Sequence, residues 1–306
     1  MITVRVPAKV NVQLGVGGLR ADGFHDLANV FFAVALGDEV TAEAGAAGEG
    51  VTLTCTGPDA ASVPLDDSNL AARAARLLAA HHGFTPNVRL HIAKAIPVAG
   101  GMAGGSADCA AALVACDALW GLGTPFETLL ELAAELGSDV PFALVGGVAL
   151  GRGRGEILQP LPVTGTFHWV FAVADGGLST PAVFRECDRL REEAGTGSSE
   201  ADVPTPDADP ALLAALADGD PAALAAALVN DLQAPALSLR PALADTLRAG
   251  TEAGAIGALV SGSGPTCAFL AKDAEAAVAI AKSLEESGTC RAAHPTYGPV
   301  AGAQVR

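Results

Sequence analysis

The sequence predicts an α+β protein of two domains, and three observations support this. The chain has 306 residues, more than one hydrophobic core ordinarily takes. Apolar residues alternate in the manner of strands through much of the first 56 positions, and they recur at helical spacing between residues 70 and 136. Strand patterns return at 167–175. We therefore expect the domains to comprise residues 1–155 and 156–306, divided where a glycine-rich segment leaves the first one.

Composition limits the kinds of partner. The net charge of −16 argues against a nucleic-acid or anionic membrane surface, where basic residues supply the affinity. The N-terminus lacks the apolar core of a signal peptide, and the longest apolar run, 140–150, is too short to span a bilayer. Six scattered cysteines form no Cys-x-x-Cys pair, so neither a zinc site nor a disulfide framework is indicated. We expect a cytoplasmic protein whose partner is a small molecule.

The first strand begins the chain. Residues 2–6 alternate, Pro7 should end the pairing, and a second alternating stretch runs through Leu14. Residues 15–23 are expected to form a turn-rich connection. Further strands are predicted at 27–36, 40–43 and 51–56.

Two pairs of side chains in this region attract attention. Lys9 and Asn11 are two apart on a predicted strand and therefore project to the same face. They form either a polar pair in a cleft or ordinary surface. Phe24 and His25 leave a loop together, where such a pair holds a planar ligand or simply packs.

Helices follow. Residues 70–82 have helical period, with Asp67 or Ser68 as the expected N-cap. A helix from about Ser106 to Leu119 is apolar almost all round and should be buried.

Between a predicted strand at 88–92 and that second helix lies a run with four glycines, at 100, 101, 104 and 105. Glycines let backbone N–H groups approach a ligand closely, and a helix N-terminus adds free donors, so the arrangement favours phosphate. The alternative is a tight turn. Because no lysine follows Gly105 and the glycine spacing is wrong for a dinucleotide fold, the loop fits neither common phosphate motif. Ser106 either caps the helix or reaches a phosphate or its metal ion.

Asp139 follows a predicted helix at 126–136 and a break at Gly137. It is either the N-cap of a short helix or a catalytic carboxylate in a cleft. A second glycine loop, 261–266, lies between two strand-like runs. Two glycine loops, a Lys/Asn pair and an isolated aspartate together suggest one site assembled from distant segments.

The rest of the second half is less specific. Arg152 and Arg154, each flanked by glycines, are expected either to meet a phosphate or to lie in an exposed loop. Residues 192–209 are rich in Gly, Ser, Pro and acidic residues, which predicts an exposed or disordered connection. Asp209-Pro210 and Asp220-Pro221 each start a short helix, with Asp at the cap and Pro at the first position.

Four segments taken together resemble the GHMP kinases, small-molecule kinases with a glycine loop of their own. They are Pro-Ala-Lys-Val-Asn at 7–11, Pro-x-x-Gly-Gly-x-x-Gly-Gly-Ser at 97–106, Gly-Ser-Asp-Val-Pro at 137–141 and Ser-Gly-Ser-Gly-Pro-Thr at 261–266. Residues 22–27 and 178–184 narrow the resemblance to members that phosphorylate a cytidine-diphosphate-linked sugar alcohol in non-mevalonate isoprenoid biosynthesis. The resemblance implies an N-terminal domain like the second domain of ribosomal protein S5, a ferredoxin-like C-terminal domain and a site between them.

The resemblance also implies roles for individual residues. Asp139 would accept the proton of the substrate hydroxyl, with Lys9 beside it as the second catalytic residue. ATP, as MgATP, would bind at Lys94, Pro97, Val98, Ala99, Gly100, Gly101, Met102, Ala103, Gly104, Gly105, Ser106, Ala107, Asp108 and Asn69. The other substrate would contact Asn11, Phe24, His25, Thr180 and Phe184. No residue is assigned to the metal, and we expect a monomer or weak homodimer.

Two alternatives remain open. The first is a GHMP kinase for another small alcohol, of homoserine or mevalonate type, against which the aromatic residues Phe24 and Phe184 argue. The second is a non-catalytic nucleotide- or sugar-binding regulator, against which the presence of both Lys9 and Asp139 argues. The loop departs from the family where alanine replaces glycine at 99 and 103. If Ala103 needs a positive φ, alanine costs about 1 kcal/mol or more there.

Overall fold

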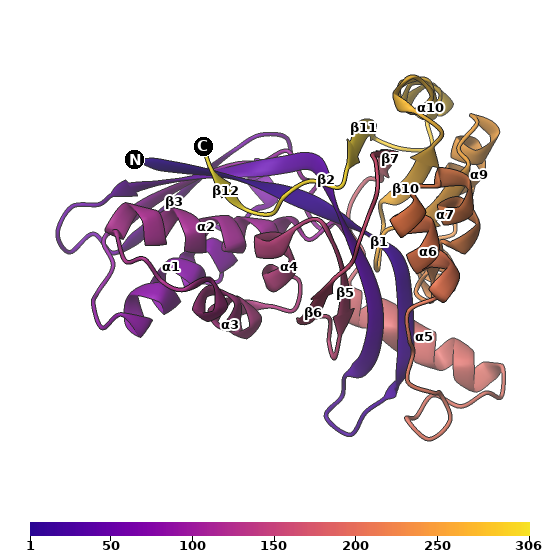
Figure 1. Cartoon of the computed structure of the whole chain (residues 1–306), viewed down its shortest axis with the longest axis horizontal. Helices are drawn as coiled ribbons and strands as arrows, with labels where there is room; N and C mark the ends of the chain where they lie inside the picture. The colour runs from indigo at the N-terminus through magenta and orange to yellow at the C-terminus, as the bar shows by residue number, and fades with distance from the viewer.

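The computed structural model describes all 306 residues, which form two sheets, each covered by helices (Figure 1). In the first sheet the strands run in the order β12-β1-β2-β4-β3, with β5 and then β6 beside β2, and β8 beside β1. In the second the order is β11-β7-β10-β9. Both chain termini lie on the first sheet, away from the second sheet (Figure 1).

The strands of the first sheet are β1 (Ile2–Leu19), β2 (His25–Ala44), β3 (Val51–Thr56), β4 (Val88–Ala93), β5 (Val148–Arg152), β6 (Ile157–Pro160), β8 (Val229–Asn230) and β12 (Gln304–Val305). Its helices are η1 (Ala60–Ser62), α1 (Leu70–His81), α2 (Gly104–Trp120), α3 (Phe126–Leu136) and α4 (Val140–Val145).

The strands of the second sheet are β7 (Phe167–Val173), β9 (Gly257–Val260), β10 (Cys267–Ala271) and β11 (Ala292–Gly298). The helices of this half are α5 (Thr180–Glu193), α6 (Pro210–Asp218), α7 (Pro221–Ala227), α8 (Gln233–Leu239), α9 (Ala242–Glu252) and α10 (Ala274–Ser287).

The first two strands are longer than predicted. β1 passes through Pro7, because the pairing with β2 shifts register between Pro7 and Ala8, and a proline fits at such an irregularity. The prediction that pairing ends at Pro7 was therefore wrong. The prediction of a turn-rich connection at 15–23 was also wrong, since β1 continues to Leu19 and only a short turn precedes β2. Figure 1 shows the two strands as a long curved pair that extends toward the second sheet.

Two helix starts differ from the prediction. α1 is capped by Asn69, whose side chain accepts a hydrogen bond of 2.8 Å from the Ala71 N–H, and neither Asp67 nor Ser68 caps it. α2 begins at Gly104, directly after a left-handed residue, so Ser106 lies inside its first turn and is not its cap. α2 is buried along most of its length, as predicted, and its small side chains let it pack closely in the core.

In the second half, the predicted aspartate caps are confirmed: Asp209 accepts from the second residue of α6, and Asp220 from two N–H groups of α7. The connection at 192–209 is largely exposed, as expected, and it lies along β1. The Leu19 N–H donates to the Ser198 carbonyl at 2.7 Å, and the Gln13 side chain donates to the Asp207 carbonyl at 2.7 Å.

The two halves share a core. Phe32 of β2 lies 5.8 Å from Phe167 and 5.9 Å from Trp169 of β7, measured between ring centroids. β6 still pairs with β5, so the chain enters the second sheet only at β7, and β8 and β12 return to β1. The division at residue 155 stays a prediction. None of the helices combines the length and apolar character needed to cross a bilayer.

Candidate active site

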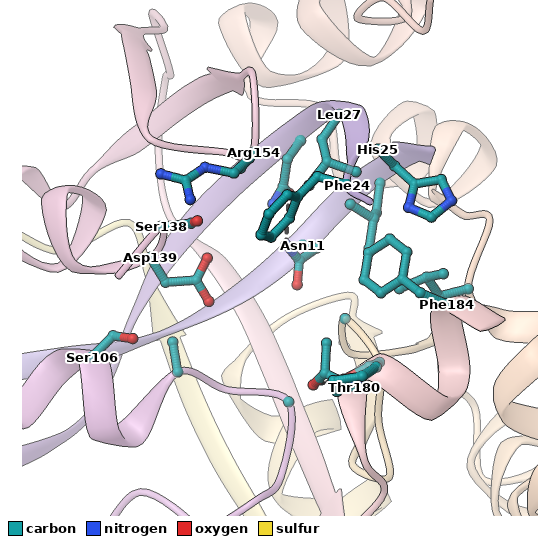
Figure 2. Close-up of a pocket in the computed structure, with 18 of the residues that line it drawn as sticks. Asn11, Phe24, His25, Leu27, Ser106, Ser138, Asp139, Arg154, Thr180 and Phe184 are labelled. Atoms are coloured by element: carbon teal, nitrogen blue, oxygen red, sulfur yellow. Dashed lines mark hydrogen bonds between the residues drawn. The ribbon is translucent and has the colours of Figure 1, made fainter. Parts of the chain in front are cut away.

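A cavity of about 860 Å³ lies between the two sheets, lined by β1, β2, both glycine loops, the start of α4 and the start of α5. Figure 2 shows its two ends. Phe24, His25 and Phe184 gather at one end, and Ser106, Ser138 and Asp139 at the other. Segments that are far apart in sequence thus form one site, as the two glycine loops and the Lys/Asn pair predicted.

Lys9 and Asn11 do project to one face of β1, and that face is the cavity. The Lys9 ammonium donates to the Asn11 side chain at 2.6 Å and to the Gly101 carbonyl at 2.9 Å. Asn11 in turn donates to the Asn29 side chain at 2.6 Å. Burial lowers the pKa of Lys9, and the charge of Asp139 opposes that shift. These contacts use two of the three ammonium protons and leave the third for a ligand.

Asp139 occupies the position before α4, but its side chain makes no capping bond. Its backbone is helical (φ −87°, ψ −9°), whereas an N-cap residue ordinarily has an extended backbone that brings its side chain over the helix end. In Figure 2 the carboxylate points into the cavity. Of the two roles left open by the sequence, the geometry favours the carboxylate in the cleft.

The first glycine loop is held by the second. The Ser261 hydroxyl donates to the Gly101 carbonyl at 3.1 Å, and a Cβ at Gly101 would lie 2.2 Å from the Ser261 carbonyl oxygen. Ala99 and Ala103 have φ of 54° and 59°, in the left-handed region. The loop residues that line the cavity are Ala99, Gly100, Gly101, Ala103, Gly104, Gly105 and Ser106.

The other residues predicted for ATP do not line this cavity; they are Asn69, Lys94, Pro97, Val98, Met102, Ala107 and Asp108. Lys94 is buried between Asp38 and Asp108, with 2.9 Å to the latter, and the two carboxylates raise its pKa although burial opposes them. Burial raises the pKa of Asp108 to about 8; Lys94 opposes this shift and Asp38 adds to it. Asn69 caps α1. The contact of these seven residues with ATP stays a prediction.

The aromatic end of the cavity is ordered by local contacts. The His25 and Phe184 rings stack, with centroids 5.1 Å apart and 29° between their planes. The Arg154 guanidinium lies 5.4 Å from the centroid of the Phe24 ring. The Thr180 hydroxyl bonds that of Ser263 at 2.8 Å, which joins α5 to the second glycine loop.

Several lining residues were missed or left open by the sequence. Arg154 lines the cavity, while Arg152 instead pairs with Asp207 at 2.8 Å. Asp188 lies four residues after Phe184, and this one-turn spacing on a helix was a usable signal. Asn29 had no such signal in the sequence, because its place opposite β1 depends on the register of two long strands. Ser138, Arg185 and Ser263 also line the cavity.

Comparison with known proteins defines the class. The family described as "GHMP kinases N terminal domain" matches residues 69–147, and "GHMP kinases C terminal" matches residues 212–290. Homologous proteins over the full length support the same family, so the chain belongs to the GHMP kinases. It is an ATP-dependent kinase with the predicted two-domain α+β fold.

Individual relatives carry a more specific name than the family does. The chain is 65% identical to the 4-diphosphocytidyl-2-C-methyl-D-erythritol kinase of Streptomyces avermitilis and 66% identical to that of Streptomyces coelicolor, with 99% of each chain covered. A crystal structure of 4-(cytidine 5'-diphospho)-2C-methyl-D-erythritol kinase is 33% identical, with a TM-score of 0.76 over 96% of this chain and 99% of that one. A homoserine kinase from Cytophaga hutchinsonii has a TM-score of 0.74 at 22% identity over 100% and 97% of the two chains, a likeness of fold alone.

Proposed function

We propose that the protein transfers the γ-phosphoryl group of ATP to the 2-hydroxyl of 4-diphosphocytidyl-2-C-methyl-D-erythritol. The products are the 2-phosphate and ADP, in the non-mevalonate (methylerythritol phosphate) route to isoprenoid precursors. The name borne by relatives 65% identical over nearly the whole chain supports the substrate. The observation that carries the proposal is the cavity itself, which joins an aromatic end to a Lys/Asp end beside a glycine loop.

The two ends of the cavity suit the two ends of such a substrate. A planar base fits against Phe24 and Phe184, where stacking is favourable. The alcohol then reaches Asp139 at the other end, and the ATP phosphates meet the N–H groups of the glycine loop and the N-terminus of α2. Both reacting groups therefore meet near Lys9.

The chemistry follows from these positions. The alcohol oxygen attacks the γ-phosphorus, the bond to the ADP oxygen breaks, and Asp139 takes the alcohol proton. Because the transition state is loose, the proton leaves late, and a weak base suffices. Lys9 neutralises charge on the phosphoryl oxygens, and positioning together with this neutralisation supplies most of the rate. The base contributes ~10²–10⁴-fold.

Magnesium enters with ATP as part of the substrate. Its charge would neutralise the phosphates, and the Ser106 hydroxyl, which lines the cavity in the first turn of α2, offers an oxygen donor of the kind that this ion prefers. The chain forms no cluster of three or more acidic, histidine or cysteine residues suited to a metal ion. An ion held mainly by phosphates and water requires none.

A substrate comparison tests the proposal. The protein is incubated with MgATP and, separately, with 4-diphosphocytidyl-2-C-methyl-D-erythritol, homoserine and mevalonate, and ADP release is followed. We expect turnover with the first alcohol alone. Turnover only with homoserine or mevalonate would replace this proposal with the related-kinase alternative, and ATP binding without any turnover would favour a regulator. The cytoplasmic location and the monomer or weak homodimer stay predictions.

A further inference from the structure

His25 and Asp188 form a contact that the reaction chemistry does not use. The His25 Nε2 atom lies 3.0 Å from a carboxylate oxygen of Asp188. His25 opens β2 and Asp188 lies on α5, so the contact joins two elements 163 residues apart in sequence. Both side chains line the cavity and are mostly buried, with 6% and 17% of their surfaces exposed.

This contact fixes which ring nitrogen of a neutral His25 carries the proton. An ionised carboxylate can only accept hydrogen bonds, so Nε2 must be the donor. In a neutral imidazole the other nitrogen is then an acceptor. No group within the chain donates to His25 Nδ1, so this acceptor is left for a ligand.

The ring is also held in orientation. Phe184 stacks on it, and Phe184 and Asp188 lie one turn apart on the same face of α5. One helix therefore sets both the plane of the imidazole and its hydrogen-bonding pattern. Figure 2 shows Phe24 on the other side of the aromatic end, which leaves a slot for a flat ring beside His25.

An acceptor beside a flat slot discriminates between pyrimidine bases. Cytosine presents an amino group at C4, which donates a hydrogen bond, whereas uracil presents a carbonyl oxygen there, which accepts. We propose that Asp188 is a positioning residue which holds His25 Nδ1 as an acceptor and thereby makes the site select cytosine over uracil. The inference rests on the proposed function, because it concerns the base of that substrate, and it assigns the selectivity to a residue outside the reacting centre.

The first experiment uses the unmodified protein. Binding of CDP and of UDP is measured by calorimetry, and turnover is measured with MgATP and either 4-diphosphocytidyl-2-C-methyl-D-erythritol or its uridine counterpart. We expect CDP to bind at least ~10-fold more tightly than UDP. The C4 carbonyl oxygen of uracil and His25 Nδ1 would both be acceptors, so no hydrogen bond could form between them. Equal affinity for the two nucleotides would overturn the inference, whatever the variants do.

The second experiment compares variants. In Asp188→Asn the side-chain amide can either accept from or donate to Nε2, so His25 can present either pattern. We expect the CDP/UDP ratio to fall to ~1–3-fold, while kcat at saturating cytidine substrate changes less than KM. Asp188→Glu keeps the carboxylate and should retain most of the selectivity. Glu193→Gln, on the same helix and outside the cavity, removes the same charge and should leave the ratio unchanged.

The outcomes separate this inference from the proposed function. Turnover of the cytidine substrate with an unchanged base preference in a folded Asp188→Asn variant overturns the role of Asp188 and leaves the kinase assignment intact. Preference for CDP that is lost in Asp188→Asn, in a protein that does not phosphorylate the cytidine substrate, supports the role of Asp188 and contradicts the proposed alcohol. Thermal unfolding of each variant establishes that it is folded.

Discussion

Asp139 shows how a side chain next to a helix start can remain free of a structural role. It precedes α4, yet it makes no capping bond and its carboxylate faces the cavity. The short helix begins instead with Pro141 in its first turn, where a missing N–H leaves no donor to satisfy. Its stability therefore depends little on the aspartate, and the carboxylate is available to take a proton.

We predict that Asp139→Asn lowers turnover at least ~10²-fold and leaves nucleotide affinity nearly unchanged, because the amide keeps the shape but cannot act as the base. Steady-state kinetics and titration with a non-hydrolysable ATP analogue measure the two effects. Asp220→Asn, at a true cap of α7, is the control and should keep full activity. Near-normal turnover of Asp139→Asn would show that the proposed proton acceptor is wrong.

Arg154 lies between the two ends of the cavity, so it is placed to meet the substrate diphosphate. Its guanidinium lies over Phe24, and its closest acidic partner, Glu156, is 3.7 Å away. Arg154→Ala should raise KM for the cytidine substrate ~10-fold with little change in KM for ATP, because one charge-assisted contact is lost. Arg152→Ala is the matched control, since Arg152 is two residues away, similarly exposed and paired with Asp207 outside the cavity. Equal effects of the two substitutions would rule out a direct contact.

At the scale of the element, α2 begins where the glycine loop ends, at a left-handed alanine. Ala103→Gly should stabilise the protein by ~0.5–1 kcal/mol, because removing a left-handed alanine gains ~1–2 kcal/mol and the freer unfolded chain takes back ~0.4–1 kcal/mol. Ala118→Gly, the same substitution in the exposed part of α2, should destabilise by ~1 kcal/mol. Urea unfolding measures the free energy of unfolding of both variants. If both substitutions change it in the same direction, the alanine at position 103 is not strained.

Periodicity identified most of the elements, because helical and strand spacing is local information. α3, β3 and the aspartate caps of α6 and α7 lie where the pattern placed them. Errors arose where a longer-range contact decided. β1 continues through Pro7 only because its partner strand accommodates a register shift there. Residues 192–209 form the exposed connection that was predicted, but no local pattern shows that they lie along β1, held by backbone and side-chain hydrogen bonds.

The candidate site was predictable in part for the same reason. Motifs indicated Lys9, Asp139 and both glycine loops, whose chemistry is visible in the residue types. The sequence could not show that Lys94 is held between Asp38 and Asp108, since its charge alone fits a ligand contact equally well. It also could not show Asn29, whose place depends on the pairing of two long strands.

At the scale of the whole molecule, an ion pair joins the two halves next to the first glycine loop. Arg291, just before β11, makes two hydrogen bonds of 2.5 and 2.8 Å to Asp59, which lies between β3 and η1. The same carboxylate accepts the Val98 N–H, at 3.4 Å, where the first glycine loop begins. Arg291 holds the pKa of Asp59 below its ordinary value, so the carboxylate is ionised at neutral pH. The second half of the chain thus helps to place the loop of the first.

We predict that Asp59→Arg and Arg291→Asp each raise KM for ATP ~5-fold, since a partly exposed bidentate pair contributes up to ~1 kcal/mol and its loss frees the start of the loop. The double variant restores the ion pair with its charges exchanged, but an arginine at position 59 offers no acceptor to the Val98 N–H, so only part of that loss should be recovered. High salt should weaken the pair in the unmodified protein, so that its KM rises toward the single-variant values. Arg248→Asp, in an exposed pair within α9, is the control and should leave KM for ATP unchanged. If the double variant is as impaired as the sum of the singles, the pair does not position the loop, and contacts such as that of Ser261 with Gly101 suffice to hold it.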